Sequence, residues 1–230
     1  AVPNWRKRYI FASIINNSMM NKEISTKIAS SLLEIEAIKL RPSQPFKWSS
    51  GWNSPIYCDN RFTLSFPLLR TYIKNCLVET IKTNFPEAES IAGVATAGIP
   101  QGALVAEALN LPFLYVRPKP KDHGMENLIE GKITKGQKVV ILEDLISTGG
   151  SSLRATEALK DAGFEVLGMV AIFTYGFEVA NENFTKAGVK LITLSDYTSL
   201  VEVVKGKKIF TEVELNSLNE WRLAPDKWLC

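Results

Sequence analysis

Two adjacent carboxylates, Glu143 and Asp144, follow a run of four apolar residues, Val139–Leu142. A stretch of small hydroxyl and glycine residues comes next and leads into a predicted helix at Ser151. Carboxylates repel a phosphate, but they accept hydrogen bonds from hydroxyl groups and hold Mg²⁺ through waters. The pair therefore predicts a site for sugar hydroxyls or for hydrated Mg²⁺.

The stretch from Ser147 to Ser151 predicts a cradle for one phosphate. Its backbone N–H groups and hydroxyls are donors, and Gly149 and Gly150 allow close approach of the backbone and φ > 0. The following helix adds the positive end of its dipole. The spacing matches neither the P-loop nor the GxGxxG fingerprint. A chance strand–turn–helix connection is the alternative, and two carboxylates next to a buried strand disfavour it.

A cationic loop, RPKPKDHG, runs from Arg117 to Gly124 and contains His123, the only histidine of the chain. A single histidine excludes multi-histidine metal sites and any mechanism that needs two imidazoles. Cations on a loop suit a negatively charged group of a ligand. The alternative for Lys119 and Lys121 is ordinary solvated charge, and for His123 it is a surface histidine without a task.

These segments need a scaffold, and apolar runs that alternate with helical patterns predict a parallel sheet covered on both faces. The runs are apolar without alternation, as strands buried on both faces are. Ligands bind at the carboxyl ends of such strands, so the loops after Ala95, Val116, Leu142 and Phe173 should meet. The expected strands are Ile56–Cys58, Ile91–Ala95, Phe113–Val116, Val139–Leu142, Val166–Phe173 and Val189–Leu194.

Helices are expected between these strands. Apolar positions at helical spacing predict a first helix over Asn21–Leu40, which Pro42 ends. Thr211 and Glu214 match a capping box. The other expected helices run from Pro67 through Ile81 and over Ile99–Leu109, Ser151–Ala162, Val179–Lys186, Asp196–Val204 and Thr211–Trp221.

The composition is that of an ordinary globular domain: 230 residues, 46% hydrophobic and 22% charged. A net charge of +3 is too mild for a general nucleic-acid partner, and no apolar run approaches the roughly 18 residues that span a membrane. Three cysteines without CxxC spacing argue against a disulfide framework or a zinc site. They favour a reducing, cytoplasmic location.

Basic residues Arg6–Arg8 precede a short apolar stretch, Tyr9–Ile15, and no acid occurs before Glu23. This pattern fits a weak targeting peptide, but the apolar stretch is short and no AxA-like cleavage site follows. The alternative is an N-terminal extension before a start at Met19 or Met20, and it is favoured.

The run EDLISTGGS from Glu143 to Ser151 resembles the 5-phosphoribosyl-1-diphosphate (PRPP) motif of type I phosphoribosyltransferases. Three further segments are similar to those of the orotate phosphoribosyltransferases. FKWSSGWNSPIYCDNR (46–61) resembles their N-terminal segment, GVATAGIP (93–100) their second loop, and RPKPKDHG (117–124) their mobile catalytic loop. Four segments in the correct order, within roughly 21–204, make the resemblance specific.

The resemblance implies an α/β fold of the type I phosphoribosyltransferase class. This fold has a parallel sheet flanked by helices, an N-terminal hood segment and a mobile catalytic loop. Residues 1–20 would be a poorly ordered N-terminal extension, and 21–230 a single domain. Within that domain the resemblance implies a hood or orotate-side segment at 21–62, a core at 63–210 and a C-terminal helix at 211–230.

The resemblance also implies a reaction: PRPP and orotate give orotidine 5′-monophosphate and pyrophosphate, a step of pyrimidine (UMP) biosynthesis. Mg²⁺ would be the cofactor, bound mainly through PRPP and water without a dedicated protein ligand. The implied partners are these small molecules and a second copy of the chain, in a homodimer whose catalytic loop acts across the interface. Neither nucleic acid nor a membrane is an expected partner.

Residue roles follow from the matched motifs. Arg117, Lys121 and His123 would contact PRPP across the dimer interface, with help from Lys119, because fixed cations stabilise a leaving pyrophosphate. These three residues and Asp144 are the expected catalytic residues. The expected PRPP contacts further along the chain are Glu143, Asp144, Leu145, Ile146, Ser147, Thr148, Gly149, Gly150 and Ser151.

Within the PRPP motif, Glu143 and Asp144 would hold the ribose hydroxyls, and the residues from Ser147 onwards the 5′-phosphate. Ser147 and Tyr57 would contact orotate, although Tyr57 could equally belong to the core. The Thr96–Gly98 turn would lie beside the pyrophosphate.

This chain departs from many family members at three positions. Ala97 and Ser49 stand where lysines are common, and Tyr175 stands where some members carry an orotate-binding arginine. No lysine or arginine role is assigned to them, which affects the orotate contacts more than the reaction. Two alternatives remain: a purine-base phosphoribosyltransferase, which the segment from Phe46 to Arg61 disfavours, and a PRPP-sensing regulator. Such a regulator would normally add a helix-turn-helix, and residues 1–40 offer only one convincing helix.

Overall fold

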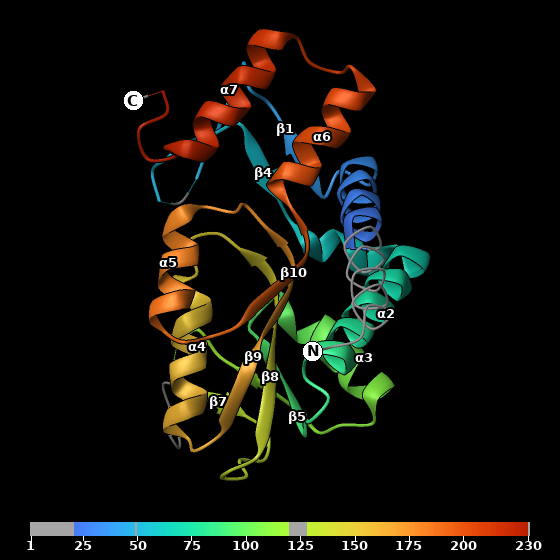
Figure 1. The fold of residues 1–230 in the computed structure, drawn as a ribbon, viewed down its shortest axis with the longest axis vertical. Coiled ribbons are helices and arrows are strands. Elements are labelled where there is room, and N and C mark those ends of the chain that lie inside the picture. Colours follow the sequence, from blue (N-terminus) through green and yellow to red (C-terminus); the bar gives the residue numbers. More distant parts are fainter. Residues whose placement is uncertain (1–20, 49, 120–127, 230) are drawn as a thin grey trace, which may run out of the picture.

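The computed structural model describes residues 21–48, 50–119 and 128–229 (Figure 1). Its centre is a six-stranded sheet in the order β10-β9-β8-β5-β6-β7. All neighbouring strands are parallel except β7, which pairs antiparallel with β6 at the edge. The strands are β5 (Ser90–Val94), β6 (Phe113–Val116), β7 (Ile129–Glu130), β8 (Lys138–Ile146), β9 (Glu165–Thr174) and β10 (Leu191–Asp196).

Helices cover both faces of this sheet, as the sequence predicts (Figure 1). In the view of Figure 1, α2 and α3 lie on one side, and α4 and α5 on the other. The helices are α2 (Pro67–Asn84), α3 (Gly98–Leu109), α4 (Gly150–Asp161), α5 (Glu178–Lys186), α6 (Tyr197–Lys207) and α7 (Glu212–Leu223). Among the described residues, no helix combines the length and the apolar character that crossing a membrane requires.

Strand β8 shows why the apolar runs do not alternate. Val140 and Leu142 belong to the core cluster that contains Leu77 of α2. Val139 and Ile141 belong to a second cluster, which contains residues of α4 and α5. Successive side chains of a strand point to opposite faces, so a central strand needs apolar residues at every position.

The hood is built differently from the prediction. Residues 21–34 are helical, but Ile38–Leu40 forms β1, so the expected single helix over Asn21–Leu40 is wrong at its C-terminal end. Glu36 has a φ of 58°, and the chain turns there. Antiparallel pairing of β1 with β4 (Ile56–Cys58) then satisfies the backbone and buries Ile38.

Three short elements complete the hood. Strands β2 (Phe46–Lys47) and β3 (Asn53–Ser54) form a two-stranded ladder, and η1 (Asn60–Ser65) is a 3₁₀ helix. None of the three was predicted. Strand β4 coincides with the strand expected at Ile56–Cys58, which is confirmed. The chain therefore runs from β4 through η1 toward the sheet.

The C-terminal helix α7 packs against the hood and the end of β9. Both hydrogen bonds of the predicted capping box between Thr211 and Glu214 are present. Trp221 is fully buried, and its ring lies 5.6 Å from that of Trp48 and 5.7 Å from that of Tyr175. These aromatic contacts fasten the hood to the carboxyl edge of the sheet.

Candidate substrate-binding site

The paired carboxylates lie within a strand and do not follow it. Strand β8 continues to Ile146, which pairs with Thr174 of β9, so the end predicted at Leu142 is wrong. The parallel ladder extends beyond the apolar run because β9 is long enough to pair with it. Glu143 and Asp144 are therefore held by a regular backbone, which fixes their positions more firmly than a loop would.

Glu143 is buried, with 6% of its surface exposed. Its Oε2 accepts a hydrogen bond from Ser152 Oγ at 3.0 Å, and its Oε1 accepts one from the backbone N–H of Asp144 at 3.0 Å. Burial, together with the adjacent Asp144 carboxylate, raises the pKa of Glu143 well above its usual range. Burial also raises the pKa of Asp144, to which Asp59 contributes by charge repulsion. Two crowded carboxyl groups of this kind favour a ligand that brings hydroxyl donors or positive charge.

The raised pKa of Glu143 predicts how stability depends on pH. The folded state binds this proton more tightly than the unfolded chain, so stability falls as the pH rises above the ordinary glutamate value of 4.5. We expect Glu143→Gln to be more stable than the wild type at neutral pH by about 1 kcal/mol, with no advantage below pH of about 4. Urea unfolding across this pH range measures the effect. The exposed Glu157→Gln serves as control, and equal pH slopes for wild type and Glu143→Gln would contradict the prediction.

The loop after β8 presents unengaged backbone donors. Among the described residues, no acceptor binds the N–H groups of Ser147, Thr148 and Gly149. The carbonyl of Thr148 instead accepts a hydrogen bond from Asn183 Nδ2 of α5 at 3.0 Å. The loop is thus held through its carbonyl side, and its N–H groups are left for an anion at the start of α4.

Gly149 supplies the backbone conformation expected of it. Its φ is 82°, and a Cβ at this position would lie 2.8 Å from the ring of Phe184. Gly149 is also the N-cap of α4 and makes no side-chain cap, so the first turn of the helix stays open to a ligand. The positive φ expected at Gly149 is confirmed, and binding of a phosphate from Ser147 to Ser151 stays a prediction.

The loop after β5 lies beside the carboxylates. Thr96 is exposed, the Ala95–Thr96 peptide bond is cis, and α3 begins at Gly98. A Cβ on Gly98 would come 2.5 Å from the carbonyl oxygen of Leu142, the residue before Glu143. The structure thus brings together the second loop and the PRPP-like motif, as expected for carboxyl ends of neighbouring parallel strands.

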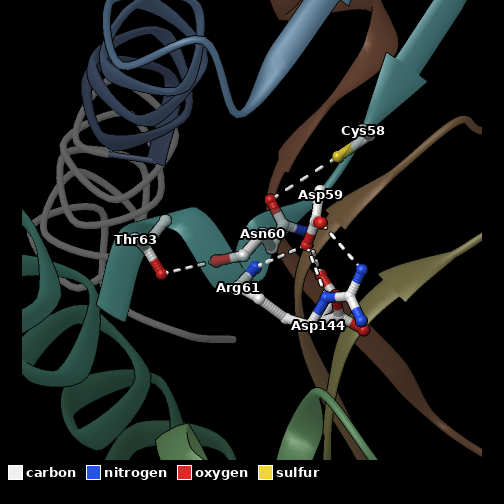
Figure 2. A network of polar contacts seen from close by, with 6 residues as sticks. All are labelled: Cys58, Asp59, Asn60, Arg61, Thr63 and Asp144. Atoms are coloured by element: carbon white, nitrogen blue, oxygen red, sulfur yellow. Dashed lines mark hydrogen bonds and ion pairs between the residues drawn. The ribbon is translucent and has the colours of Figure 1, made fainter. Parts of the chain in front are cut away.

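Residues 58–61 of the hood also lie beside Asp144 (Figure 2). Asn60 Nδ2 donates to the carbonyl oxygen of Asp144 at 2.8 Å, and the Cys58 thiol donates to Asn60 Oδ1 at 3.6 Å. Burial, followed by the charges of Asp144 and Asp59, raises the pKa of Cys58 well above its usual range. Residues 58–61 of the hood therefore line one side of the candidate site.

Tyr57, the predicted orotate contact, is 43% exposed, which excludes the alternative that it belongs to the core. Its ring lies 5.7 Å from that of Phe46. Tyr175 is 3% exposed and packs among Trp48, Phe177 and Trp221. Tyr175 is therefore a member of the aromatic core beside the hood, and the structure gives it no exposed surface comparable to that of Tyr57.

The cationic loop begins at the end of β6. Arg117 donates its backbone N–H to the carbonyl of Leu128 at 2.7 Å, and its Nη1 forms a 3.4 Å ion pair with Glu130 of β7. Lys119 is exposed. The predicted site residues Lys121 and His123 lie outside the described residues, as do Ser49 and the proposed extension at 1–20.

Sequence reasoning missed three residues at this site: Asn60, Arg61 and Ser152. Asn60 and Ser152 bind the strand that carries the carboxylates, and Arg61 forms an ion pair with Asp59. The spacing of Ser152, which places it in the first turn of a helix facing Glu143, is a local signal that could have revealed it. The contact of Asn60 with a residue 84 positions away has no local signal.

A parallel sheet flanked by helices, with a carboxylate pair and a loop of unengaged backbone donors at one edge, fits the phosphoribosyltransferase fold that the sequence predicts. The family model described as "Phosphoribosyl transferase domain" matches residues 68–210. The chain is also 62% identical over 202 residues to the orotate phosphoribosyltransferase of Cytophaga hutchinsonii, covering 88% of this chain and 97% of that protein. The chain belongs to the orotate phosphoribosyltransferase family.

Solved structures agree with this assignment. The orotate phosphoribosyltransferase of Aeropyrum pernix superposes with a TM-score of 0.70 at 31% identity, covering 78% of this chain and 98% of that one. The UMP synthase of Leishmania donovani gives a TM-score of 0.72 at 24% identity, over 86% of this chain and 42% of that chain. The second likeness shows the fold alone, and this chain spans less than half of that larger protein.

Proposed function

We propose that this protein transfers the 5-phosphoribosyl group from PRPP to orotate, forming orotidine 5′-monophosphate and pyrophosphate in pyrimidine biosynthesis. The observation that carries the proposal is the carboxylate pair on β8 joined to the donor loop at 147–149, in a chain 62% identical to a named orotate phosphoribosyltransferase. PRPP has a phosphate at one end and ribose hydroxyls beside it, which is the order of groups that these residues would bind.

In this proposal each segment has a distinct task. The N–H groups from Ser147 to Ser151 bind the 5′-phosphate. Glu143 and Asp144 accept hydrogen bonds from the ribose hydroxyls. The turn at Thr96–Gly98 lies beside the pyrophosphate. Tyr57 and Ser147 contact orotate. Contacts at both ends of PRPP orient its anomeric carbon toward the base before any bond breaks.

Departure of pyrophosphate builds positive charge on the ribose and negative charge on the leaving group. The negative charge of Asp144 beside the ribose stabilises the first, and cations stabilise the second. Arg117, Lys121 and His123 supply those cations, with Lys119 assisting. Closure of the loop that carries them would exclude water, which would otherwise hydrolyse PRPP.

Mg²⁺ is the proposed cofactor. The oxygen donors of Glu143 and Asp144 suit a hard cation bound through waters, and its positive charge would offset the burial and the charge repulsion that raise the pKa of both groups. In this proposal the ion is held mainly by PRPP and by water, without a dedicated protein ligand. Bound there, Mg²⁺ supplies charge neutralisation to the diphosphate.

We also propose that the active form is a homodimer in which the catalytic loop of one copy reaches the site of the other. Support comes from Phe62, Phe66 and Leu68, three large apolar side chains of η1 and the start of α2 that are 47%, 40% and 90% exposed. Exposed apolar groups so near the site suit a second copy. A cytoplasmic location, which rests on the cysteine content, stays a prediction.

The test is the loss of orotate absorbance in the ultraviolet on addition of PRPP and Mg²⁺, compared with uracil, adenine and hypoxanthine. We expect turnover with orotate alone. His123→Ala should lower turnover about tenfold, since a charge-assisted hydrogen bond to a leaving group contributes about 1.5 kcal/mol or more. Turnover with a purine instead would favour the purine-base alternative. PRPP binding without consumption of any base would favour a regulator.

A further inference from the structure

Arg61 lies where the hood passes beside Asp144 (Figure 2). Its guanidinium donates two hydrogen bonds to the Asp59 carboxylate, from Nε to Oδ1 at 2.7 Å and from Nη2 to Oδ2 at 2.7 Å. Asp59 Oδ1 also accepts the backbone N–H of Arg61 at 3.1 Å, so the side chain is fixed at both ends. A fork held at Nε and Nη2 leaves Nη1 on the far side of the guanidinium. Among the described residues, Nη1 has no hydrogen-bond partner.

The backbone of Arg61 is tied to the strand that bears the carboxylates. The preceding residue, Asn60, is 2% exposed and donates its amide to the carbonyl of Asp144 at 2.8 Å. The carbonyl of Asn60 accepts a 2.6 Å hydrogen bond from Thr63 Oγ1. Arg61 is therefore not a loosely placed surface arginine, since its neighbours fix it relative to the site.

The surroundings of Arg61 are acidic. Asp59 and Asp144 are close enough to repel each other, and Arg61 interacts electrostatically with both Asp144 and Tyr57. The side chain of Asp59 is 13% exposed, whereas that of Arg61 is 58% exposed. Arg117, a cation at the end of β6, is paired with Glu130. An anionic ligand group that approached the acids from the hood side would meet the exposed guanidinium first.

We propose that Arg61 is a substrate-binding residue whose free N–H groups bind anionic oxygens of a ligand seated beside Asp144. The proposal rests on the proposed function, in which two ligands carry such oxygens near the reacting carbon: the orotate carboxylate and the PRPP diphosphate. Both have the planar or forked oxygen geometry that a guanidinium recognises. Without Arg61, either group would be placed among carboxylates that repel it.

The competing explanation is that Arg61 serves only the fold, by pairing with the N-cap of η1 at Asp59. Two variants separate the explanations because both break the ion pair, and only one removes the cation. Arg61→Gln removes the guanidinium and leaves Asp59 in place. Asp59→Asn leaves the guanidinium, with an amide oxygen that still accepts one of its hydrogen bonds.

The experiment measures the KM of each substrate, kcat and the thermal unfolding midpoint for the wild type and both variants, with Arg61→Lys as a third. We expect Arg61→Gln to raise one KM about tenfold or more, and Asp59→Asn to raise it less than about threefold. Arg61→Lys should recover part of the loss because it keeps the charge without the fork. The KM that changes identifies the ligand: orotate for its carboxylate, PRPP for its diphosphate. If orotate responds, the affinity of uracil as a competing ligand, measured as inhibition of orotate turnover, should not change, because uracil lacks the carboxylate.

Equal effects of Arg61→Gln and Asp59→Asn on KM would overturn the proposal, and so would unchanged values for both substrates. In either case Arg61 would act through the fold. If the wild type consumes no orotate, the proposed function fails by itself. Calorimetric titration of wild type and Arg61→Gln with PRPP and with orotate then still tests Arg61, and equal affinities would refute its role.

Discussion

Asp144→Asn is expected to lower kcat/KM for PRPP about 100-fold while the protein remains folded. In the proposed function the Asp144 carboxylate accepts hydrogen bonds from the ribose hydroxyls. It also stabilises the positive charge that develops on the ribose. Hydrogen bonds to charged groups contribute about 1.5–3 kcal/mol, and about 2.7 kcal/mol corresponds to 100-fold. An amide keeps the shape and loses the charge, so the loss should appear in kcat as well as in KM.

Asp144→Asn should raise the free energy of unfolding at neutral pH, although it lowers kcat/KM. Burial raises the pKa of Asp144, which means that the folded state holds its negative charge at a disadvantage at neutral pH. Asparagine removes that disadvantage, and the Asn60 hydrogen bond survives because it involves the backbone carbonyl. Asp161→Asn, at the exposed end of α4, is the matched control and should change neither quantity. A folded Asp144→Asn enzyme with wild-type kcat/KM would remove Asp144 from the catalytic residues.

Local chemistry in the sequence was sufficient to predict the main features of this candidate site, the acids on β8 and the loop that follows them. The run from Glu143 to Ser151 combines acids, small hydroxyl residues and glycines, and those residue types impose the backbone conformations that the structure contains. Gly149 has the positive φ that its place in the motif requires. The parallel sheet followed equally directly, because central strands such as β8 must be apolar on both faces.

The errors occur where a partner distant in sequence decides the outcome. Ile35 and Ile38 continue a helical spacing, yet pairing with Ile56–Cys58 makes Ile38 part of a strand. Strand β8 extends through Glu143 and Asp144 because β9 pairs with it, although hydropathy ends at Leu142. Two-residue strands such as β2 have no periodicity to detect. Single-residue patterns cannot reveal such partners.

Gly98→Ala is expected to destabilise the protein by about 3 kcal/mol, the upper part of the range for overpacking a tight contact. Its Cβ would lie 2.5 Å from the Leu142 carbonyl oxygen, a backbone atom that cannot move away as a flexible side chain would. A second close approach joins α3 to the sheet, since a Cβ on Gly93 would lie 2.8 Å from the carbonyl of Gly98. Relief of the clash therefore requires α3 to move away from β5 and β8.

That movement should also impair binding, because the turn at Thr96–Gly98 leads into α3 beside the carboxylates. We expect the KM for PRPP to rise more than the KM for orotate. Steady-state kinetics measures both KM values, and urea unfolding of the same preparation measures the loss of stability. Gly206→Ala is the matched control. Gly206 lies in α6, and apart from its chain neighbours and the backbone of its own helix no atom lies within 4 Å of the added methyl, so the change should stabilise the protein by about 0.5–1 kcal/mol. Equal stability of the two variants would show that α3 and β8 tolerate a wider separation. An unchanged KM for PRPP in Gly98→Ala would show that the close packing of the second loop has no role in placing PRPP.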